Sequence, residues 1–173
     1  MLALRLPRPS DSDLVLEWRN SPDVARFMYR DDPIPATEHA NWFPSTLFDG
    51  PNTCYRVAEW NGRPSGWISL SRIDRRNRSC EWGGYLAPSA PRGTGIGRHM
   101  LAASLDLAFT GLGLHRLVVE VLDGNDRAIG LYKALGFTHE GVLRQRAWQS
   151  TGPRDVIIMS ILATEWIGGD GFQ

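Results

Sequence analysis

The sequence predicts a single α/β domain built on a mixed β-sheet, and three observations lead to that prediction. Runs with the alternation typical of strands are interspersed with runs that have the apolar spacing of helices. The length of 173 residues is close to the usual size of one domain, and 42% of the residues are hydrophobic, enough for a sizeable core. The sequence has no internal repeat and no interdomain linker, so we expect one domain over residues 1–173.

The N-terminal third predicts one strand and three short helices. Residues 2–6 alternate between leucine and other residues, as in a strand. Ser10 can cap a helix that ends near residue 20, and a second short helix begins at Pro22, where proline is favoured. A third helix is predicted over residues 38–48, with a kink at Pro44.

The central third predicts a hairpin followed by a further strand. Asn61-Gly62 is the strongest short hairpin signal, and strand-like runs at 55–60 and 67–70 flank it. A polar turn leads to a strand at 80–86, in which Gly83-Gly84 predicts a bulge or a close approach of another backbone. Four strands are therefore expected before the glycine-rich loop that follows.

The last third alternates helices and strands. A helix over 98–109 precedes an almost continuously apolar strand at 114–122, which Glu120 interrupts. A helix over 126–135 ends at Gly136, because glycine is a natural C-terminal stop. Two closing strands are predicted at 137–143 and 155–162.

Charge and cysteine content exclude several classes of function. Lys and Arg together number 19, as do Asp and Glu, so the formal net charge is zero. A nucleic-acid-binding surface is normally basic, and we expect no nucleic-acid partner. Two cysteines do not make a disulfide framework, and no apolar run approaches the roughly 18 residues of a membrane span. The N-terminus also lacks the features of a signal peptide, so we expect a cytoplasmic protein without membrane contact.

The most informative segment is the loop Arg92-Gly93-Thr94-Gly95-Ile96-Gly97-Arg98, between a predicted strand and a predicted helix. A glycine-rich loop that opens a helix presents unpaired backbone N–H groups, and the helix dipole adds to their attraction for an anion. The loop therefore predicts a site for the pyrophosphate of a cofactor or nucleotide. It does not match a dinucleotide fingerprint, which lies in the first strand–helix unit, or a P-loop, which ends in Lys-Ser or Lys-Thr.

A second motif follows the apolar strand and consists of Asn125, Ala128-Ile129, Tyr132 and Leu135-Gly136-Phe137. Together with Arg92, Gly95 and Gly97, it resembles the GNAT superfamily of N-acetyltransferases, and the order of elements matches over about residues 4–166. The resemblance implies a twisted mixed sheet of about seven strands, splayed at the centre, with helices on both faces. It also implies acetyl-CoA as co-substrate, no metal, and direct transfer of the acetyl group to a primary amine.

The resemblance assigns an acetyl-CoA site as well. The pyrophosphate would lie on the amides of the glycine-rich loop, and the pantetheine arm would pair with the strand that contains Tyr85 and Leu86. The backbone there would face the thioester oxygen. Asn125 would hydrogen-bond the pantetheine arm or the backbone along the slot. The predicted set is Tyr85, Leu86, Arg92, Gly93, Thr94, Gly95, Ile96, Gly97, Arg98 and Asn125.

The chemistry needs one group that takes a proton from the amine and another that protonates the leaving thiolate. A free thiol has a pKa of about 8.5. By the resemblance, Tyr132 protonates the thiolate. Glu81 is the first choice of base, acting through water, because the family often places a glutamate on the splayed strand. Glu120, His39 and a water chain without a single base remain alternatives.

The first third of a GNAT chain usually builds the acceptor site. Here the string Trp18-Arg19-Asn20-Ser21-Pro22-Asp23-Val24 resembles the amino-sugar nucleotide N-acetyltransferases of pseudaminic acid biosynthesis. This implies the 4-amino group of a UDP-linked dideoxy amino sugar as acceptor, with cations for the diphosphate and aromatic groups for uracil and sugar. The predicted substrate residues are Arg19, Asn20, Tyr29, His39 and Trp42.

Two other functions stay open at this level. Close variants of the same string occur in GNAT enzymes that acetylate the N-termini of ribosomal proteins, so a protein α-amine is the first alternative. A non-catalytic acyl-CoA-binding module that keeps the fold is the second, and Tyr132 speaks against it. The sequence also leaves the oligomeric state undecided, and a homodimer is one of the states it allows.

Overall fold

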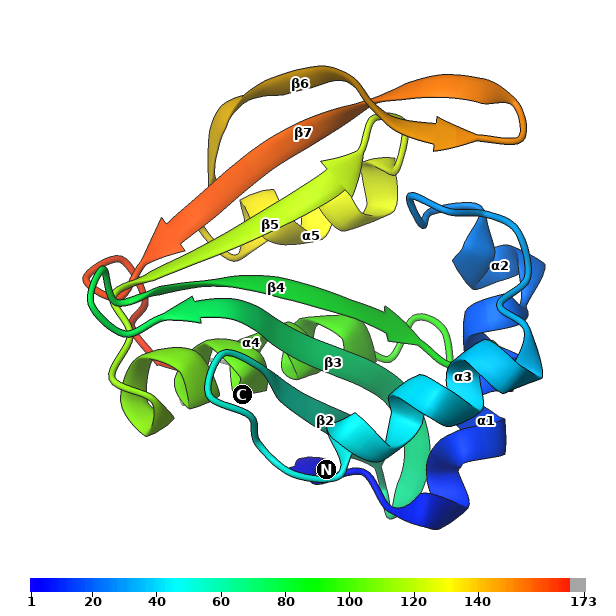
Figure 1. The fold of residues 1–173 in the computed structure, drawn as a ribbon. Coiled ribbons are helices and arrows are strands. Elements are labelled where there is room, and N and C mark those ends of the chain that lie inside the picture. Colours follow the sequence, from blue (N-terminus) through cyan, green and yellow to red (C-terminus); the bar gives the residue numbers. More distant parts are fainter. Residues whose placement is uncertain (169–173) are drawn as a thin grey trace.

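The computed structural model describes residues 1–168, and a seven-stranded sheet forms its centre (Figure 1). The strands are β1 (Leu2–Arg5), β2 (Cys54–Trp60), β3 (Arg63–Asp74), β4 (Ser79–Leu86), β5 (Arg116–Leu122), β6 (Thr138–Gln149) and β7 (Gly152–Leu162). The helices are α1 (Ser12–Asn20), α2 (Pro22–Ala25), α3 (Ala36–Trp42), α4 (Ile96–Asp106) and α5 (Asp126–Ala134). Short 3-10 turns lie at Pro9–Asp11 and Phe43–Thr46, and a π-helical turn lies at Leu107–Gly111.

The strand order is β1-β2-β3-β4-β5-β7-β6, and every neighbouring pair is antiparallel except β4 and β5, which are parallel. Hydrophobic side chains cover both faces, since successive residues of a strand point to opposite sides. On one face, Leu101 of α4 and Tyr132 of α5 belong to the same core as Trp82. On the other, Trp18 of α1 belongs to a core with Trp67. The predicted mixed sheet with helices on both faces is confirmed.

β4 and β5 separate part-way along their length. Residues 79–82 of β4 pair with residues 116–119 of β5, and the pairing stops at Trp82. Beyond that point β4 remains bonded to β3 and β5 remains bonded to β7, so the two strands diverge, as Figure 1 shows. This confirms the predicted splay at the centre of the sheet.

The structure decides between the two conformations predicted for Gly83-Gly84. Gly83 and Gly84 pair regularly with β3. The register shift between β3 and β4 lies elsewhere, between Ser71 and Asp74. The predicted bulge at the two glycines is therefore wrong. The alternative, a close backbone approach, holds, because a Cβ on Gly84 would lie 2.9 Å from the carbonyl oxygen of Trp67.

One predicted turn is confirmed, and one predicted strand end is wrong. Asn61 and Gly62 have φ values of 52° and 78°, as the predicted hairpin turn requires. β6, however, continues to Gln149, well beyond the predicted end. The register of β6 shifts after Leu143, and Gln145 has a φ of 52°, so the regular alternation that would reveal a strand is interrupted there.

Candidate active site

The loop between β4 and α4 presents backbone donors to solvent. Gly93 and Gly95 have φ values of 77° and 75°, in the left-handed region that glycine adopts without strain. In the part of the chain that the structure describes, none of the amides from Gly93 to Gly97 donates a hydrogen bond. The first turn of α4 closes only at His99, whose amide donates to the carbonyl of Gly95 at 3.0 Å. The loop therefore has the open donors that an anion requires.

Open space lies beside two of these residues, Gly93 and Gly95. A Cβ on Gly93 would meet no atom within 4 Å, and one on Gly95 would meet only the His99 ring at 3.5 Å. Ile96 is 2% exposed and anchors the start of α4 in the core, while the Thr94 hydroxyl donates to the carbonyl of Pro91 at 3.1 Å. A loop that is anchored at Ile96, with free amides and space beside Gly93 and Gly95, fits a diphosphate group.

Tyr132 packs against Trp82, the last residue of β4 that pairs with β5. The two ring centroids are 6.1 Å apart in an edge-to-face arrangement, and Phe137 packs on the other side at 5.4 Å. Burial raises the pKa of Tyr132, so its hydroxyl stays protonated at neutral pH. Within residues 1–168, neither this hydroxyl nor the buried Nε1 of Trp82 has a hydrogen-bond partner. Polar groups of a bound ligand would satisfy both.

The second sequence motif sets the position of α5. Asn125 precedes the helix, and its side-chain oxygen accepts from the amide of Ala128 at 3.4 Å, which caps the first turn. Gly136, with a φ of 91°, follows the last turn. Asn125 thus has a structural role that explains its place in the motif, and its predicted bond to the pantetheine arm stays a prediction.

Glu81 and Glu120 lie on the opposite face of the sheet from Trp82 and Tyr132. Glu81 is beside Val118 in the register of β4 and β5, and Glu120 is two residues further along β5. Glu81 accepts from the Arg72 guanidinium at 2.8 Å, and the two side chains are 31% and 69% exposed. Such an exposed ion pair contributes only about 0–1 kcal/mol and is easily broken. The predicted role of Glu81 as a base stays a prediction.

The α2–α3 connection, residues 26–35, lies beside the β6–β7 hairpin (Figure 1). The side-chain amide of Gln149 donates to the carbonyls of Arg26 and Met28 at 3.0 and 2.7 Å. The amide of Ser150 donates to the Asp31 carboxylate at 3.0 Å. The connection is thus held by a hairpin that lies more than a hundred residues later in the chain.

Tyr29, from this connection, reaches the parting strands, because its hydroxyl donates to Oε2 of Glu120. Burial and the nearby carboxylate raise the pKa of Tyr29. The guanidinium carbon of Arg146 lies 5.6 Å from the centre of the Tyr29 ring. Among the predicted substrate residues, Tyr29 is the one for which the structure shows a direct link to the centre of the sheet.

Arg19 and Asn20, at the end of α1, hold the same connection. Arg19 donates from Nη2 to the carbonyl of Arg30 at 2.7 Å, whereas its Nη1 is buried without a partner in the described residues. Burial lowers the pKa of Arg19, and the largest opposing influence is Tyr85. Asn20 bonds both backbone groups of Ile34, at 3.0 and 2.8 Å. Asn20 therefore shapes the connection, and Arg19 has one nitrogen left for another group.

His39 and Trp42 belong to an aromatic cluster around α3. His39 is 4% exposed, its Nε2 lies 2.9 Å from the carbonyl oxygen of Ser12, and its ring centroid is 5.5 Å from that of Trp42. Trp42 is 38% exposed and packs edge-on against Tyr55 and Trp67. These contacts give both residues a packing role, and their predicted contact with substrate stays a prediction.

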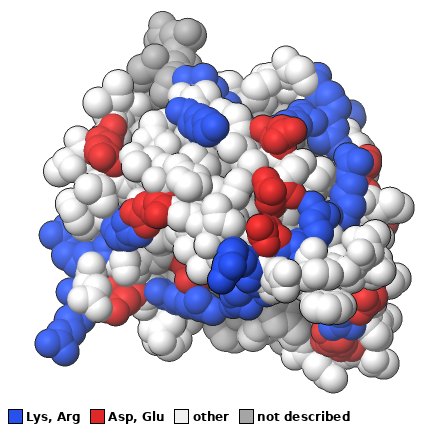
Figure 2. Space-filling view, turned by 90° about the horizontal axis from the view of Figure 1, so that it is seen from above, with Lys and Arg blue, Asp and Glu red and all other residues white. Residues whose placement is uncertain are grey.

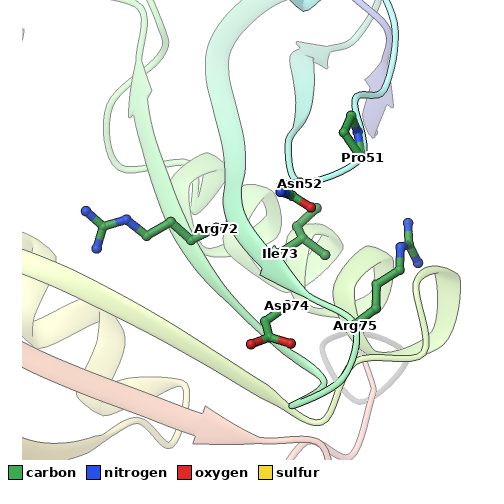
Figure 3. A pocket seen from close by; sticks show the side chains of 6 residues that line it. All are labelled: Pro51, Asn52, Arg72, Ile73, Asp74 and Arg75. Atoms are coloured by element: carbon green, nitrogen blue, oxygen red, sulfur yellow. The ribbon is translucent and has the colours of Figure 1, made fainter.

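A surface pocket of about 560 Å³ lies at the end of β3 that is distant from the glycine-rich loop (Figure 3). It is lined by Pro51, Asn52, Arg72, Ile73, Asp74 and Arg75. Figure 3 shows Arg72 pointing away from Arg75, and Arg72 is the residue that pairs with Glu81. The glycine-rich loop follows the opposite end of β4, since Asp74 pairs with Ser79 and Gly66 pairs with Leu86. The pocket is not the anion site.

The surface charge is mixed on the face that Figure 2 shows, with Lys and Arg interspersed among Asp and Glu. This agrees with the balanced composition and does not resemble a surface for a polyanion. Within residues 1–168, none of the helices combines the length and apolar character needed to cross a bilayer. The same residues contain no group of three His, Cys, Asp or Glu side chains placed to hold a metal ion.

Comparison with known proteins identifies the family. A family model described as an acetyltransferase (GNAT) domain matches residues 1–138. The chain belongs to the GNAT family of acetyltransferases. Its fold is similar to the crystal structure of the spermidine N-acetyltransferase from Vibrio cholerae in complex with CoA and spermine, with a TM-score of 0.88, 25% identity, and coverage of 96% of this chain and 98% of the other.

Two curated GNAT relatives extend the comparison. The spermidine N(1)-acetyltransferase of Vibrio cholerae is 25% identical over 166 residues, which is 96% of this chain and 95% of the relative. The N-alpha-acetyltransferase RimI of Mycobacterium tuberculosis is 31% identical over 130 residues, 74% of this chain and 75% of the relative. The protein is thus a GNAT enzyme that uses acetyl-CoA to acetylate an amine.

The residues present fit acetyl-CoA. The open amides of Gly93 to Gly97 suit its pyrophosphate, and the unpaired Trp82 Nε1 and Tyr132 hydroxyl suit the polar groups of a pantetheine arm. When bound, acetyl-CoA supplies an activated acetyl group and a thiolate leaving group. Sequence reasoning predicted this half of the site, and the contacts of its residues with acetyl-CoA stay predictions. It missed the unpaired Trp82 nitrogen and the hydrogen bonds from Gln149 to the α2–α3 connection. The local sequence carries no signal for either.

Proposed function

We propose that this GNAT enzyme acetylates a primary amine of a small polyamine such as spermidine. The observation that carries the proposal is the pair of carboxylates, Glu81 and Glu120, on the face of the parting strands opposite Tyr132. A primary amine has a pKa near 10 and arrives as a cation, which two carboxylates attract. The spermidine acetyltransferase relatives, which match over 96% of this chain, support the same acceptor class.

In this proposal, the loop amides and Arg92 hold the pyrophosphate, and the backbone of Tyr85 and Leu86 faces the thioester. Tyr132 protonates the leaving thiolate. Its raised pKa does not prevent this, because the same desolvation acts on the acceptor of the proton. Burial raises the pKa of the thiols of Cys54 and Cys80 to about 12 in this protein, and a thiolate formed beside Tyr132 would be affected in the same direction.

An amino-sugar nucleotide is the second candidate. The observation in its favour is Nη1 of Arg19, a buried cationic donor without a partner in the described residues. A phosphate or carboxylate oxygen of the acceptor would satisfy it, and a polyamine has no such group. None of the relatives reported for this chain is named for an amino sugar, so an amino-sugar nucleotide ranks below a polyamine as the acceptor. An N-terminal α-amine, for which RimI is the relative, and a homodimer stay predictions.

An acceptor panel tests the proposal. The purified protein is incubated with acetyl-CoA and, separately, spermidine, a UDP-linked 4-amino sugar and an N-terminal peptide. Thiol release and product mass are measured, and the highest kcat/KM is expected with spermidine. Turnover of the sugar nucleotide alone would reject the polyamine and keep the acetyltransferase. Binding of acetyl-CoA without turnover of any amine would instead support the non-catalytic module.

A further inference from the structure

Glu120 lies at the point where β5 leaves β4. Val119 is the last residue of β5 that pairs with β4, and Glu120 follows it. Its side chain projects from the sheet face opposite Tyr132, because it alternates with Val119 and Val121, which share a core with Tyr132. Glu120 therefore interrupts an apolar strand at the position where β5 stops pairing with β4.

The only partner of Glu120 in the described residues is Tyr29. The phenolic hydroxyl donates to Oε2, and the other oxygen, Oε1, accepts no hydrogen bond from any residue between 1 and 168. Glu81, by contrast, is already paired with Arg72. Of Glu81 and Glu120, Glu120 is the one with an oxygen left for a ligand and without a cationic neighbour bound to it.

Tyr29 is itself held from several sides. The charged groups that act on it are Glu120 of β5, Glu81 of β4 and Arg146 of β6. On its own segment, Gln149 binds the carbonyl of Met28 at 2.7 Å, and the Asp31 carboxylate accepts from the amide of Ser150 at 3.0 Å. These bonds on both sides of Tyr29 restrict where its hydroxyl can lie, and hence where Glu120 can lie.

We propose that Tyr29 is a positioning residue for the acceptor amine: its hydroxyl holds Glu120 so that the second carboxylate oxygen receives the amine. This inference rests on the proposed function and deepens it. The α2–α3 connection then contributes to the chemistry without contacting the reacting atoms, and the β6–β7 hairpin sets the connection in place. Glu120 takes the role of proton acceptor that the sequence assigned first to Glu81.

Each proton that the amine loses has an acceptor in this proposal. The acceptor ammonium gives one proton to Glu120 and becomes a neutral amine, a transfer that desolvation favours because it disfavours both charges. The amine nitrogen forms a bond to the acetyl carbon, the carbon–sulfur bond breaks, and the sulfur takes the hydroxyl proton of Tyr132. The second proton lost by the nitrogen restores Tyr132, and the proton on Glu120 leaves to solvent.

The test compares pH profiles of kcat/KM with spermidine for the full chain and for Glu120→Gln, Tyr29→Phe, Glu81→Gln and Glu17→Gln. Glu120→Gln should lower kcat/KM about 100-fold or more. It should also abolish the acidic limb of the profile, which is the fall of kcat/KM at low pH. Tyr29→Phe should keep that limb but move it to higher pH, because the lost hydrogen bond stabilised the charged carboxylate. Glu81→Gln should keep the acidic limb even if its kcat/KM falls. Glu17 is exposed, and Glu17→Gln should match the wild type in both kcat/KM and pH profile.

Acetyl-CoA affinity and the unfolding temperature of each variant separate this result from misfolding. If Glu120→Gln does not fold, Glu120→Asp is used, with a loss of about 10-fold and a retained limb expected. Loss of the acidic limb in Glu81→Gln alone, or an unmoved limb in Tyr29→Phe, would overturn the inference while leaving the acetyltransferase intact. A wild type that acetylates no amine would instead remove the proposed function, and the inference with it.

Discussion

The acetyl-CoA half and the acceptor half of this enzyme are built in different ways. The first lies within one continuous stretch, residues 79–137, and its anion loop and helix cap depend on local contacts such as His99 to Gly95 and Asn125 to Ala128. The second depends on contacts between distant parts of the chain. Tyr29 and Glu120 are 91 positions apart, and Gln149 and Arg26 are 123 apart.

This difference matches what each half recognises. Backbone amides at a helix start bind a diphosphate in any chain that folds the same way, because every residue supplies the same donor. Acceptor recognition uses side chains such as Glu120, Tyr29 and Arg19, and each can change without changing the fold. The family is therefore evident from the first half, and the substrate must be sought in the second. Four variants test this division.

Tyr132→Phe should have the largest effect, because it removes the proposed acid while keeping the ring packed on Trp82. We expect kcat to fall about 10²- to 10⁴-fold while the Kd of acetyl-CoA changes less than about twofold. Steady-state kinetics and calorimetric titration measure the two quantities. Tyr55→Phe, in the aromatic cluster of the other face, is the control. A kcat within tenfold of the wild type would show that another group protonates the thiolate.

Gly95→Val should weaken acetyl-CoA binding by about tenfold or more. A β-branched residue is strained at a φ of 75° by about 1–2 kcal/mol and would project toward the loop's open side. Gly113→Val is the matched control, because Gly113 has a similar φ of 67° but lies before β5. Both variants should lose thermal stability, and only Gly95→Val should raise the Kd. Equal affinities in the two variants would count against the loop as the pyrophosphate site.

Arg19→Met distinguishes the two acceptor classes. If the acceptor carries a phosphate or carboxylate, its KM should rise about 10- to 100-fold, the usual value of a hydrogen bond to a charged group. With spermidine the KM should change less than about threefold, because this acceptor offers Nη1 no partner and the variant loses only the exposed Nη2 bond to the carbonyl of Arg30. Arg63→Met, on an exposed side chain, is the control. A large KM effect on spermidine would mean that Arg19 shapes the polyamine site itself.

Glu140→Gln should have the smallest effect and should concern the scaffold alone. Arg116, at 2.6 Å, and Ser160 lower the pKa of Glu140 from its usual 4.5 to about 2. A lowered carboxyl pKa stabilises the fold fully above about pH 4.5, and this stabilisation disappears as the pH falls toward 2. Because both side chains are about one-third exposed, we expect a loss of less than about 1 kcal/mol at pH 7.

Urea denaturation at pH 7 and at pH 2.5 measures that difference. The two proteins should differ in free energy of unfolding at pH 7 and converge at the lower pH. Their kcat/KM should be equal at pH 7, because Glu140 lies on β6 and bonds only Arg116 and Ser160 among the described residues. A change in acetyl-CoA affinity would show that the scaffold and the site are coupled.

Local chemistry explains why so much of the fold and of the acetyl-CoA half could be predicted. The turn at Asn61-Gly62 and the left-handed glycines at 93 and 95 follow from backbone preferences that neighbouring residues impose. The predictions failed where a local pattern has two outcomes. Gly83-Gly84 allowed a bulge or a close approach, and only the position of Trp67 on β3 decides between them.

By itself, the sequence determined the mixed sheet, the splay implied by its family motifs, the anion loop and the acetyl-CoA chemistry. The patterns that predicted them, such as strand alternation, the glycine-rich loop and the family motifs, each involve residues close together in the chain. Only the tertiary structure decided that Tyr29 holds Glu120, that Arg72 occupies Glu81 and that Arg19 is buried with one nitrogen unpaired. Those pairings join distant segments, and the packing of the whole domain chooses them.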